Sequence, residues 1–283
     1  MSIFKNTVRP VAHFFKYRVR NSVLWARSKQ RNWGDDFNPW LFNKLTGEKA
    51  VYCPHKSCHR LLMAGSILGG AGKYDTCWGT GLISDDLTVP LKLSKALAVR
   101  GPLSAKKLEQ SGITAPIIYG DPGLIASRLI PLPKNKKYKR SVIPHYVDRD
   151  RGEKFAKEMG FHVINVDLPI EKFIEEVASS EEVWSSSLHG IICAESMQIP
   201  TTWIQFSDQI IGGYFKYHDY LLGTQRQIRQ PLDLSKAWSN KIGSQCLDAF
   251  DVNSIVQKLL SVFPKRINSN LSNKNFYSPN YNP

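Results

Sequence analysis

Residues 184–200 contain the sequence feature that most limits the fold, because they change within a few positions from a strand pattern to a helix pattern. The apolar residues before Ser185 predict a buried strand, and those from Ile191 recur at helical spacing until Pro200. His189 lies at the predicted turn between them. Such a junction places a histidine at the carboxyl edge of a sheet, beside helix amides that bind anions. The alternative is that His189 only caps the helix or fills a gap in the core.

Strand and helix patterns alternate along the rest of the chain. This alternation predicts an α/β protein with largely parallel sheets that are covered on both faces. Strands are expected at residues 50–53, 61–64, 77–82, 97–101, 116–119, 141–144, 161–166, 182–184 and 202–206, and helices at 39–45, 104–110, 153–159, 169–179, 191–199 and 251–263.

The best candidate for a domain boundary is the segment 131–140, which is polar, rich in lysine and contains prolines. We therefore predict an N-terminal Rossmann-like domain over residues 32–133 and a C-terminal one over residues 138–265. Residues 1–31 would form a basic leader. Residues 268–283 are rich in Asn, Ser, Pro and Tyr, which predicts a mobile tail.

Two glycine-containing segments in the N-terminal half are candidates for close approach to a ligand. Residues 32–38 are predicted to form a loop that opens a helix, with Pro39 in its first turn. Asp35 or Asp36 could equally serve only as a cap of that helix. Residues 65–72 form a glycine-rich loop that lacks the Gly-Lys-Ser/Thr ending of a P-loop. This loop indicates close backbone approach either to a ligand or to a neighbouring strand.

The chain is strongly basic, and its N-terminal leader contains positive charge without any negative charge. Among 283 residues, 38 lysines and arginines outnumber 24 acidic residues, for a formal net charge of +14 at pH 7. In residues 1–31 the basic residues alternate with apolar ones, so this leader could lie on an anionic membrane surface. The alternative is an ordinary first helix with a solvated basic face. Nucleic acid is not an expected partner, because no nucleic-acid-binding motif is present.

Cysteine usage indicates the cellular compartment. The five cysteines are odd in number and scattered, which favours reduced thiols in the cytosol over a disulfide framework. Cys53, Cys58 and His59 do not have the spacing of a standard zinc module, so no metal site is predicted. The chain contains no apolar run of about 18 residues and no signal-peptide pattern. We expect a cytoplasmic protein, either free or peripheral on the inner face of the membrane through residues 1–31.

Six short motifs occur in order over residues 30–225. They are Asn32-Trp33-Gly34-Asp35-Asp36, Leu62-Met63-Ala64-Gly65-Ser66-Ile67-Leu68, Val99-Arg100-Gly101-Pro102, Tyr119-Gly120-Asp121-Pro122-Gly123, Ile143-Pro144-His145-Tyr146-Val147-Asp148 and Ser186-Ser187-Leu188-His189-Gly190. Together they resemble the motifs of the polysaccharide pyruvyl transferase family. The resemblance implies two Rossmann-like domains with a central cleft, similar to the two-domain (GT-B-type) glycosyltransferases. The Ser-Ser-Leu-His version is similar to the subgroup that acts in bacterial exopolysaccharide synthesis.

The resemblance also implies roles for individual residues. His189 matches the histidine that contacts phosphoenolpyruvate, where it would bind phosphate as imidazolium or act as a general acid. Ser187 occupies a position where the family often has an arginine, so a cation is expected from Lys216, Arg149 or Arg151 instead. The phosphoenolpyruvate side is thus expected to contain Ser187, His189, Gly190, Lys216, His145, Arg149 and Arg151, and the acceptor side Asp35, Asp36 and Arg100.

The leading hypothesis is a transferase that moves pyruvate from phosphoenolpyruvate onto two hydroxyls of a sugar, forming a cyclic ketal and releasing phosphate. Phosphoenolpyruvate is the donor substrate, no cofactor is expected, and the acceptor is a lipid-linked oligosaccharide or a polysaccharide. Two other classes stay open. One is a nucleotide-sugar glycosyltransferase, because fold alone does not determine function. The other is a non-catalytic module that binds anionic glycan or membrane. As alternatives for single residues, Lys216 is an ordinary surface charge and Asp121 only caps the next helix.

Overall fold

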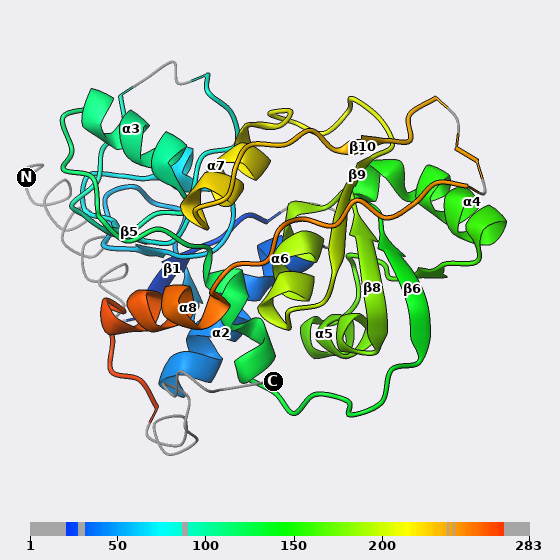
Figure 1. Cartoon of the computed structure of the whole chain (residues 1–283). Coiled ribbons are helices and arrows are strands. Elements are labelled where there is room, and N and C mark those ends of the chain that lie inside the picture. Colours follow the sequence, from blue (N-terminus) through cyan, green and yellow to red (C-terminus); the bar gives the residue numbers. More distant parts are fainter. Residues whose placement is uncertain (1–20, 28–31, 87–89, 237, 240, 269–283) are drawn as a thin grey trace, which may run out of the picture.

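The computed structural model describes residues 21–27, 32–86, 90–236, 238–239 and 241–268, and contains two five-stranded parallel β-sheets (Figure 1). The first sheet consists of β1 (Ser22–Leu24), β2 (Val51–Tyr52), β3 (Leu61–Leu62), β4 (Thr76–Trp78) and β5 (Lys95–Ala98). The second consists of β6 (Tyr138–Ile143), β7 (His162–Val163), β8 (Ser180–Ser185), β9 (Thr201–Gln205) and β10 (Leu232–Asp233). This architecture confirms the predicted α/β class with parallel sheets.

Helices connect and cover these strands. The α-helices are α2 (Trp33–Thr46), α3 (Pro102–Gln110), α4 (Arg149–Met159), α5 (Ile170–Ala178), α6 (Leu188–Ser196), α7 (Phe215–Gly223) and α8 (Val252–Ser261). Three 3-10 helices complete the set: η1 (Leu68–Gly70), η2 (Pro122–Arg128) and η3 (Tyr146–Asp148). Among the described residues, no helix has the length and apolar character needed to cross a membrane.

Both sheets have the strand order of a doubly wound fold. The order is β2-β1-β3-β4-β5 in the first sheet and, read from the corresponding edge, β7-β6-β8-β9-β10 in the second. The direction of winding therefore reverses between β1 and β3 and again between β6 and β8. Ligands of open α/β sheets bind outside the carboxyl ends of the strands at such a switch point. The topology thus marks two edges at which a site is expected.

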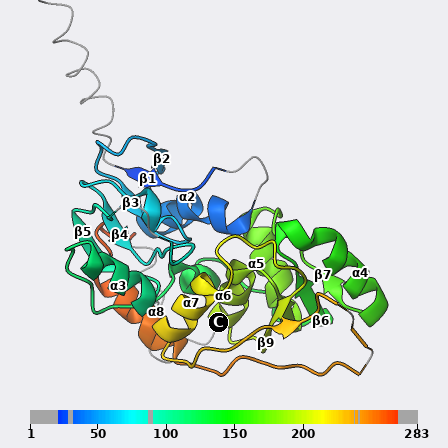
Figure 2. The same cartoon turned by 90° about the horizontal axis from the view of Figure 1, so that it is seen from above.

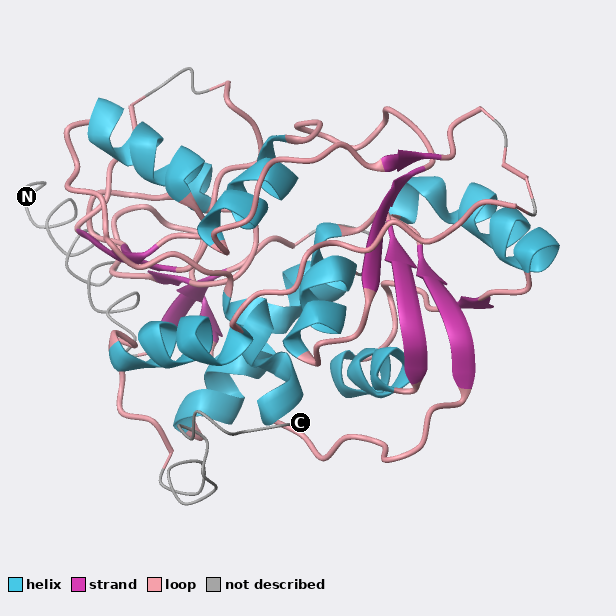
Figure 3. Cartoon of the chain, viewed as in Figure 1, coloured by secondary structure: helices cyan, strands magenta, loops and turns pink. Residues whose placement is uncertain are grey.

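Successive residues of the second sheet face two different cores. Val142 of β6 and Trp184 of β8 pack with Phe155 of α4. Their neighbours Ile143 and Val183 belong to the larger core, to which α5 and α6 also contribute. Helices therefore cover both faces of this sheet, as strand alternation requires (Figures 2 and 3). The larger core also contains α2 residues from the first half of the chain, so one apolar core joins the two halves.

Helices α7 and α8, which lie in the second half of the sequence, pack against the first half. On α7, the Asp219 carboxylate accepts hydrogen bonds from the backbone N–H (3.0 Å) and hydroxyl (2.7 Å) of Ser104 in α3. A Cβ on Gly101 would lie 1.8 Å from the Asp219 carbonyl oxygen, so this contact requires glycine. The indole of Trp78 donates to the Leu259 carbonyl of α8 at 2.8 Å. Helix α8, which lies within the predicted C-terminal domain, therefore also contacts the N-terminal half.

The N-terminal segment differs from its prediction in two ways. Residues 33–38 were expected in a loop, but they form the start of α2, with Pro39 inside the helix. The reason is that the Asn32 side chain accepts from the Gly34 N–H at 3.2 Å and caps the helix earlier than expected. Ser22–Leu24 of the expected leader form β1, a central strand that pairs with β2 and β3. The membrane-surface helix predicted for residues 1–31 therefore does not extend over this strand, and residues 1–20 and 28–31 lie outside the described residues.

Four other sequence predictions concern the strand at residues 116–119, Asp121, the C-terminal tail and the domain limits. The strand expected at residues 116–119 is reduced to one isolated bridge between Val99 and Tyr119. Asp121 caps η2, as its alternative reading predicted, by accepting from the Gly123 N–H at 2.9 Å. The tail at residues 269–283 lies outside the described residues. The limits given above for the two domains stay a prediction.

Candidate active site

A cavity of about 230 Å³ lies at the carboxyl ends of the strands that flank both switch points. Its lining includes residues that follow β1, β3, β6 and β8, which are Ala26, Ser66, His145 and Ser187. The two sheets therefore present their expected ligand-binding edges to the same space. His189 at the start of α6 and Lys216 at the start of α7 also line it.

The loop between β8 and α6 is held by the hydroxyl of Ser185. The Ser185 hydroxyl oxygen accepts from the Ser187 N–H at 3.0 Å, and the hydroxyl donates to the Ile143 carbonyl of β6 at 3.0 Å. Ser187 occupies the N-cap position of α6, but its side chain makes no capping hydrogen bond. A Cβ on Gly190 would lie 2.5 Å from Ser185 Oγ, so this glycine allows the loop and the helix to pack closely. The first amides of α6 are thus positioned without a side-chain cap.

His189 is the second residue of α6 rather than part of a turn. Its imidazole lies against Gly34 of α2, where an added Cβ would be only 2.1 Å from His189 Nδ1. Its Nε2 is buried and has no hydrogen-bond partner in the described part of the chain. Burial, and then the charges of Lys216, Arg100 and His145, lower the pKa of His189 to about 3. The imidazole is therefore neutral at pH 7, and a nearby anion would raise its pKa.

Among the described residues, Lys216 is the Lys or Arg side chain that lines the cavity with His189. Its side chain is buried, and burial together with the charge of Arg100 lowers its pKa to about 8, while Asp35 acts in the opposite direction. The ammonium is thus mostly protonated at pH 7 but titrates close to neutrality. Burial and the charge of Lys216 lower the pKa of His145 to about 4. Burial is the first cause of each shift and neighbouring positive charges add to it, so the site combines low solvent access with positive charge, which suits an anion.

Arg100 lies behind the cavity rather than in it. It is fully buried, and its guanidinium donates to the Asp219 carboxylate at 3.2 Å, to Ser66 Oγ at 2.8 Å and to the Leu82 carbonyl at 2.5 Å. Through Ser66 it positions a hydroxyl of the cavity lining, and its charge depresses the pKa values of Lys216 and His189. Its role in acceptor binding stays a prediction.

Two predicted cations lie elsewhere. Arg149 pairs with Asp167 at 2.7 Å near the surface. Arg151 donates to the Leu234 carbonyl and lines a separate surface cavity. Five of the predicted site residues line this cavity: Asp35, His145, Ser187, His189 and Lys216. The other five are not part of its lining: Asp36, Arg100, Arg149, Arg151 and Gly190.

The structure adds Gly34 and Ser66 to the site, which sequence reasoning had not assigned. Both belong to the six sequence motifs, but only the packing of the two halves shows that Gly34 touches His189 and that Ser66 lines the cavity. Within the described residues, no group of three or more His, Cys, Asp or Glu side chains is arranged to hold a metal ion.

Fold and cavity together define a two-sheet α/β protein in which two histidines and a lysine face one site. Residues 88–208 match the family model for polysaccharide pyruvyl transferase. An uncharacterized protein (L143) of Acanthamoeba polyphaga mimivirus is 30% identical over 213 residues, which are 68% of this chain and 71% of that protein. The succinoglycan biosynthesis protein ExoV of Rhizobium meliloti (strain 1021) is 28% identical over 204 residues, 68% of this chain and 61% of that protein. The chain belongs to the polysaccharide pyruvyl transferase family, which confirms the resemblance seen in the motifs.

Proposed function

We propose that this protein transfers the pyruvyl group of phosphoenolpyruvate onto two hydroxyls of a sugar during exopolysaccharide synthesis. Family membership and the similarity to a succinoglycan biosynthesis protein support this reaction class. The observation that carries the proposal is the placement of His145, His189 and Lys216 in one cavity beside both switch points. In this proposal the two Rossmann-like halves correspond to the GT-B arrangement, with the substrates between them.

Phosphoenolpyruvate binds between the Lys216 ammonium and the first turn of α6. A small, multiply charged anion is favoured by a fixed cation and by the amides of a helix N-terminus. Lys216 supplies the positive charge that an arginine supplies in many family members at the position that Ser187 occupies here. The bound anion raises the pKa of His189 from its low value, because it offsets the positive charges around the ring. An imidazolium therefore forms at His189 only when the anion is present.

The reaction proceeds by addition and then displacement at C2 of phosphoenolpyruvate. One acceptor hydroxyl adds to C2 while the C3 methylene takes up a proton and becomes a methyl group. The second hydroxyl then forms its bond to C2 as the C2–O bond to phosphate breaks. One of the two hydroxyl protons accounts for the proton added at C3, and the other leaves with phosphate. We assign these proton transfers to His189, whose buried Nε2 has no partner within the described residues.

The acceptor sugar approaches from the side of Asp35 and Ser66, which the first half of the chain contributes to the cavity lining. Carboxylate and hydroxyl oxygens are suitable partners for sugar hydroxyls. A lipid-linked acceptor would bring the enzyme to the inner face of the membrane. The basic leader would then hold it there, a role that falls on residues mostly outside those the structure describes.

Two measurements test this proposal on the full chain. Phosphoenolpyruvate should raise the melting temperature, whereas UDP-sugars should not. Phosphate release from phosphoenolpyruvate in the presence of a glycolipid extract of the source cells should be lost in His189→Ala and kept in His59→Ala, a matched change at an exposed histidine. Unchanged release in His189→Ala would remove this residue from the mechanism. Stabilisation by UDP-sugars alone would favour a glycosyltransferase, and glycan binding without phosphate release would favour a non-catalytic module.

A further inference from the structure

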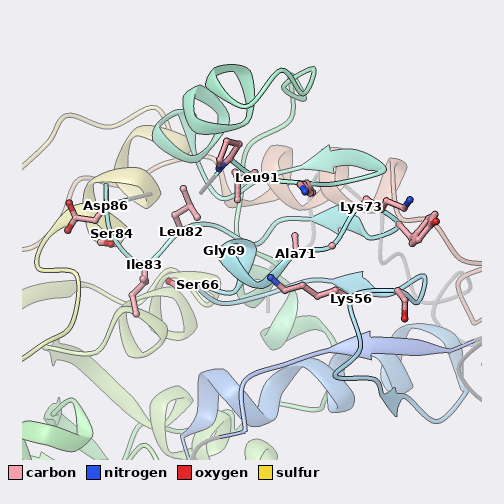
Figure 4. Close-up of a pocket in the computed structure, with 15 residues that line it drawn as sticks. Lys56, Ser66, Gly69, Ala71, Lys73, Leu82, Ile83, Ser84, Asp86 and Leu91 are labelled. Atoms are coloured by element: carbon pink, nitrogen blue, oxygen red, sulfur yellow. The ribbon is translucent and has the colours of Figure 1, made fainter. Parts of the chain in front are cut away.

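A second cavity, of about 800 Å³, lies on the N-terminal half and adjoins the candidate active site (Figure 4). The two cavities share Ser66 and Ile83 in their linings, so they lie next to each other. The larger cavity is lined in part by the glycine-rich loop at residues 65–72. The sequence left open whether this loop approaches a ligand or a neighbouring strand.

Positive charge dominates the lining of the larger cavity. Lys56, Lys73 and Lys92 are all exposed, and in the described part of the chain none of them forms an ion pair with a carboxylate. Asp86 is the one acidic residue among the described residues of the lining, and Figure 4 shows it at the opposite end of the cavity from Lys73. We call this cavity, with its three lysines, the lysine trough.

A buried ion pair makes the wall of the lysine trough rigid. Arg60 and Asp75 are almost fully buried and pair at 2.5 Å. Arg60 also donates to the Gly70 carbonyl at 3.1 Å, and Asp75 accepts from the Gly72 N–H at 2.7 Å. A Cβ on Gly72 would lie 2.5 Å from the Lys56 carbonyl oxygen, so the loops that bear Lys56 and Lys73 pack directly together. Lys56 and Lys73 therefore project from one fixed frame rather than from independent loops.

We propose that the lysine trough binds a multiply charged oxyanion that is part of the acceptor glycan. The inference rests on the proposed function, because it assigns the acceptor, and not phosphoenolpyruvate, to this space. The smaller cavity holds the proposed reacting groups, whereas the trough has over three times its volume and is not lined by His189. An elongated acceptor fits both: its sugar hydroxyls pass Ser66 and Ile83 while its charged group lies over the lysines. The oxyanion is either a diphosphate that links the glycan to its carrier or the carboxylates of acidic sugars.

Binding measurements on the full chain test the lysine trough with defined probes. Inorganic diphosphate and trigalacturonate represent the two sources of charge, and galactotriose is the neutral control. Affinities are measured by calorimetry at low salt for the wild type and for the triple variant Lys56→Gln, Lys73→Gln, Lys92→Gln. The matched control changes Lys134, Lys157 and Lys258, which are exposed lysines outside the trough, to Gln. Phosphoenolpyruvate binding is followed in every variant by thermal shift.

We expect at least one charged probe to bind more tightly than galactotriose, and the trough variant to lose about tenfold of that affinity. The control variant should keep it, and the probe that binds identifies the source of the charge. The proposal is overturned if neither charged probe binds, if the trough variant binds as the wild type does, or if the control variant loses as much. Phosphoenolpyruvate should shift the melting temperature equally in all three proteins. Absence of that shift in the wild type would instead contradict the proposed function.

Discussion

At the scale of single residues, Gly34 is the clearest link between the two halves of the site. Any side chain at this position would collide with the His189 ring, because an added Cβ would lie 2.1 Å from Nδ1. Gly34→Ala should therefore displace the imidazole while leaving the helix intact, because alanine favours helix over glycine. A displacement of about 1 Å costs on the order of 100-fold in rate. We expect that loss in phosphate release from phosphoenolpyruvate, with an unchanged circular dichroism spectrum.

The matched control for this change is Gly243→Ala, because a Cβ there has no heavy atom within 4 Å. It should retain full activity. If Gly34→Ala were as active as Gly243→Ala, the contact between α2 and His189 would have no part in catalysis.

Lys216 should make phosphoenolpyruvate binding depend on pH. Its pKa is lowered to about 8, so the ammonium is present below that pH and is lost as the pH rises through it. Well above pH 8 the affinity should therefore fall by about a further tenfold per unit, in addition to the change at lower pH that comes from proton uptake at His189. Lys216→Arg should shift the fall to higher pH, because guanidinium stays protonated. Lys216→Met should weaken binding about tenfold to 100-fold at pH 7. Dissociation constants measured from pH 6 to pH 10 by thermal shift would refute the assignment if the wild type and Lys216→Met had the same profile.

At the scale of elements, the Asp219 carboxylate of α7 holds this helix against the first half. This carboxylate is fully buried, pairs with Arg100 and accepts two hydrogen bonds from Ser104. Asp219→Asn leaves the buried Arg100 charge without its partner, which should lower the free energy of unfolding by about 3 kcal/mol. Urea unfolding measures this loss, with Asp248→Asn, whose side chain is exposed, as the control. Equal stability of the two variants would show that the ion pair does not hold α7 in place.

Elements that have a strong local pattern could be predicted from the sequence. Residues 170–178 form a helix because their apolar residues recur on one side, and the strand at 180–185 ends in three buried residues, Val183, Trp184 and Ser185. The helix at residues 33–46 began earlier than predicted, because its start depends on a cap by Asn32 and its first turn is fixed by contact with the other half. The strand at residues 22–24 was missed because three residues within a basic segment carry no usable periodicity.

The candidate site could be predicted only in part, for reasons of the same kind. His145 and His189 follow strands, so topology alone places them at the switch point of the second sheet. Lys216 reaches the cavity through the docking of α7 on the first half, a tertiary contact that no local pattern encodes. Arg149 and Arg151 have the right charge and lie close to His145 in sequence, but α4 carries them away to other partners.

At the scale of the whole molecule, the two halves should unfold together. Residues of both halves share the larger apolar core, and the N–H of Trp33 donates to the Val166 carbonyl across the halves at 2.6 Å. Helix α8 comes last in sequence but is held by Trp78 of the first sheet. Calorimetry should therefore give one transition whose calorimetric and van't Hoff enthalpies agree.

Trp78→Phe tests this cooperativity, because it removes the hydrogen bond to α8 and keeps most of the apolar ring. If the halves are coupled, the single transition should move to lower temperature by a few degrees and stay single, since a loss of about 1 kcal/mol shifts the melting temperature by roughly 2–4 °C in a chain of this size. The proposed donor, phosphoenolpyruvate, should raise the same transition, because residues of both halves line the cavity assigned to it. Two separate transitions, with only one sensitive to the variant, would show instead that the halves fold independently and that the site forms by their later docking.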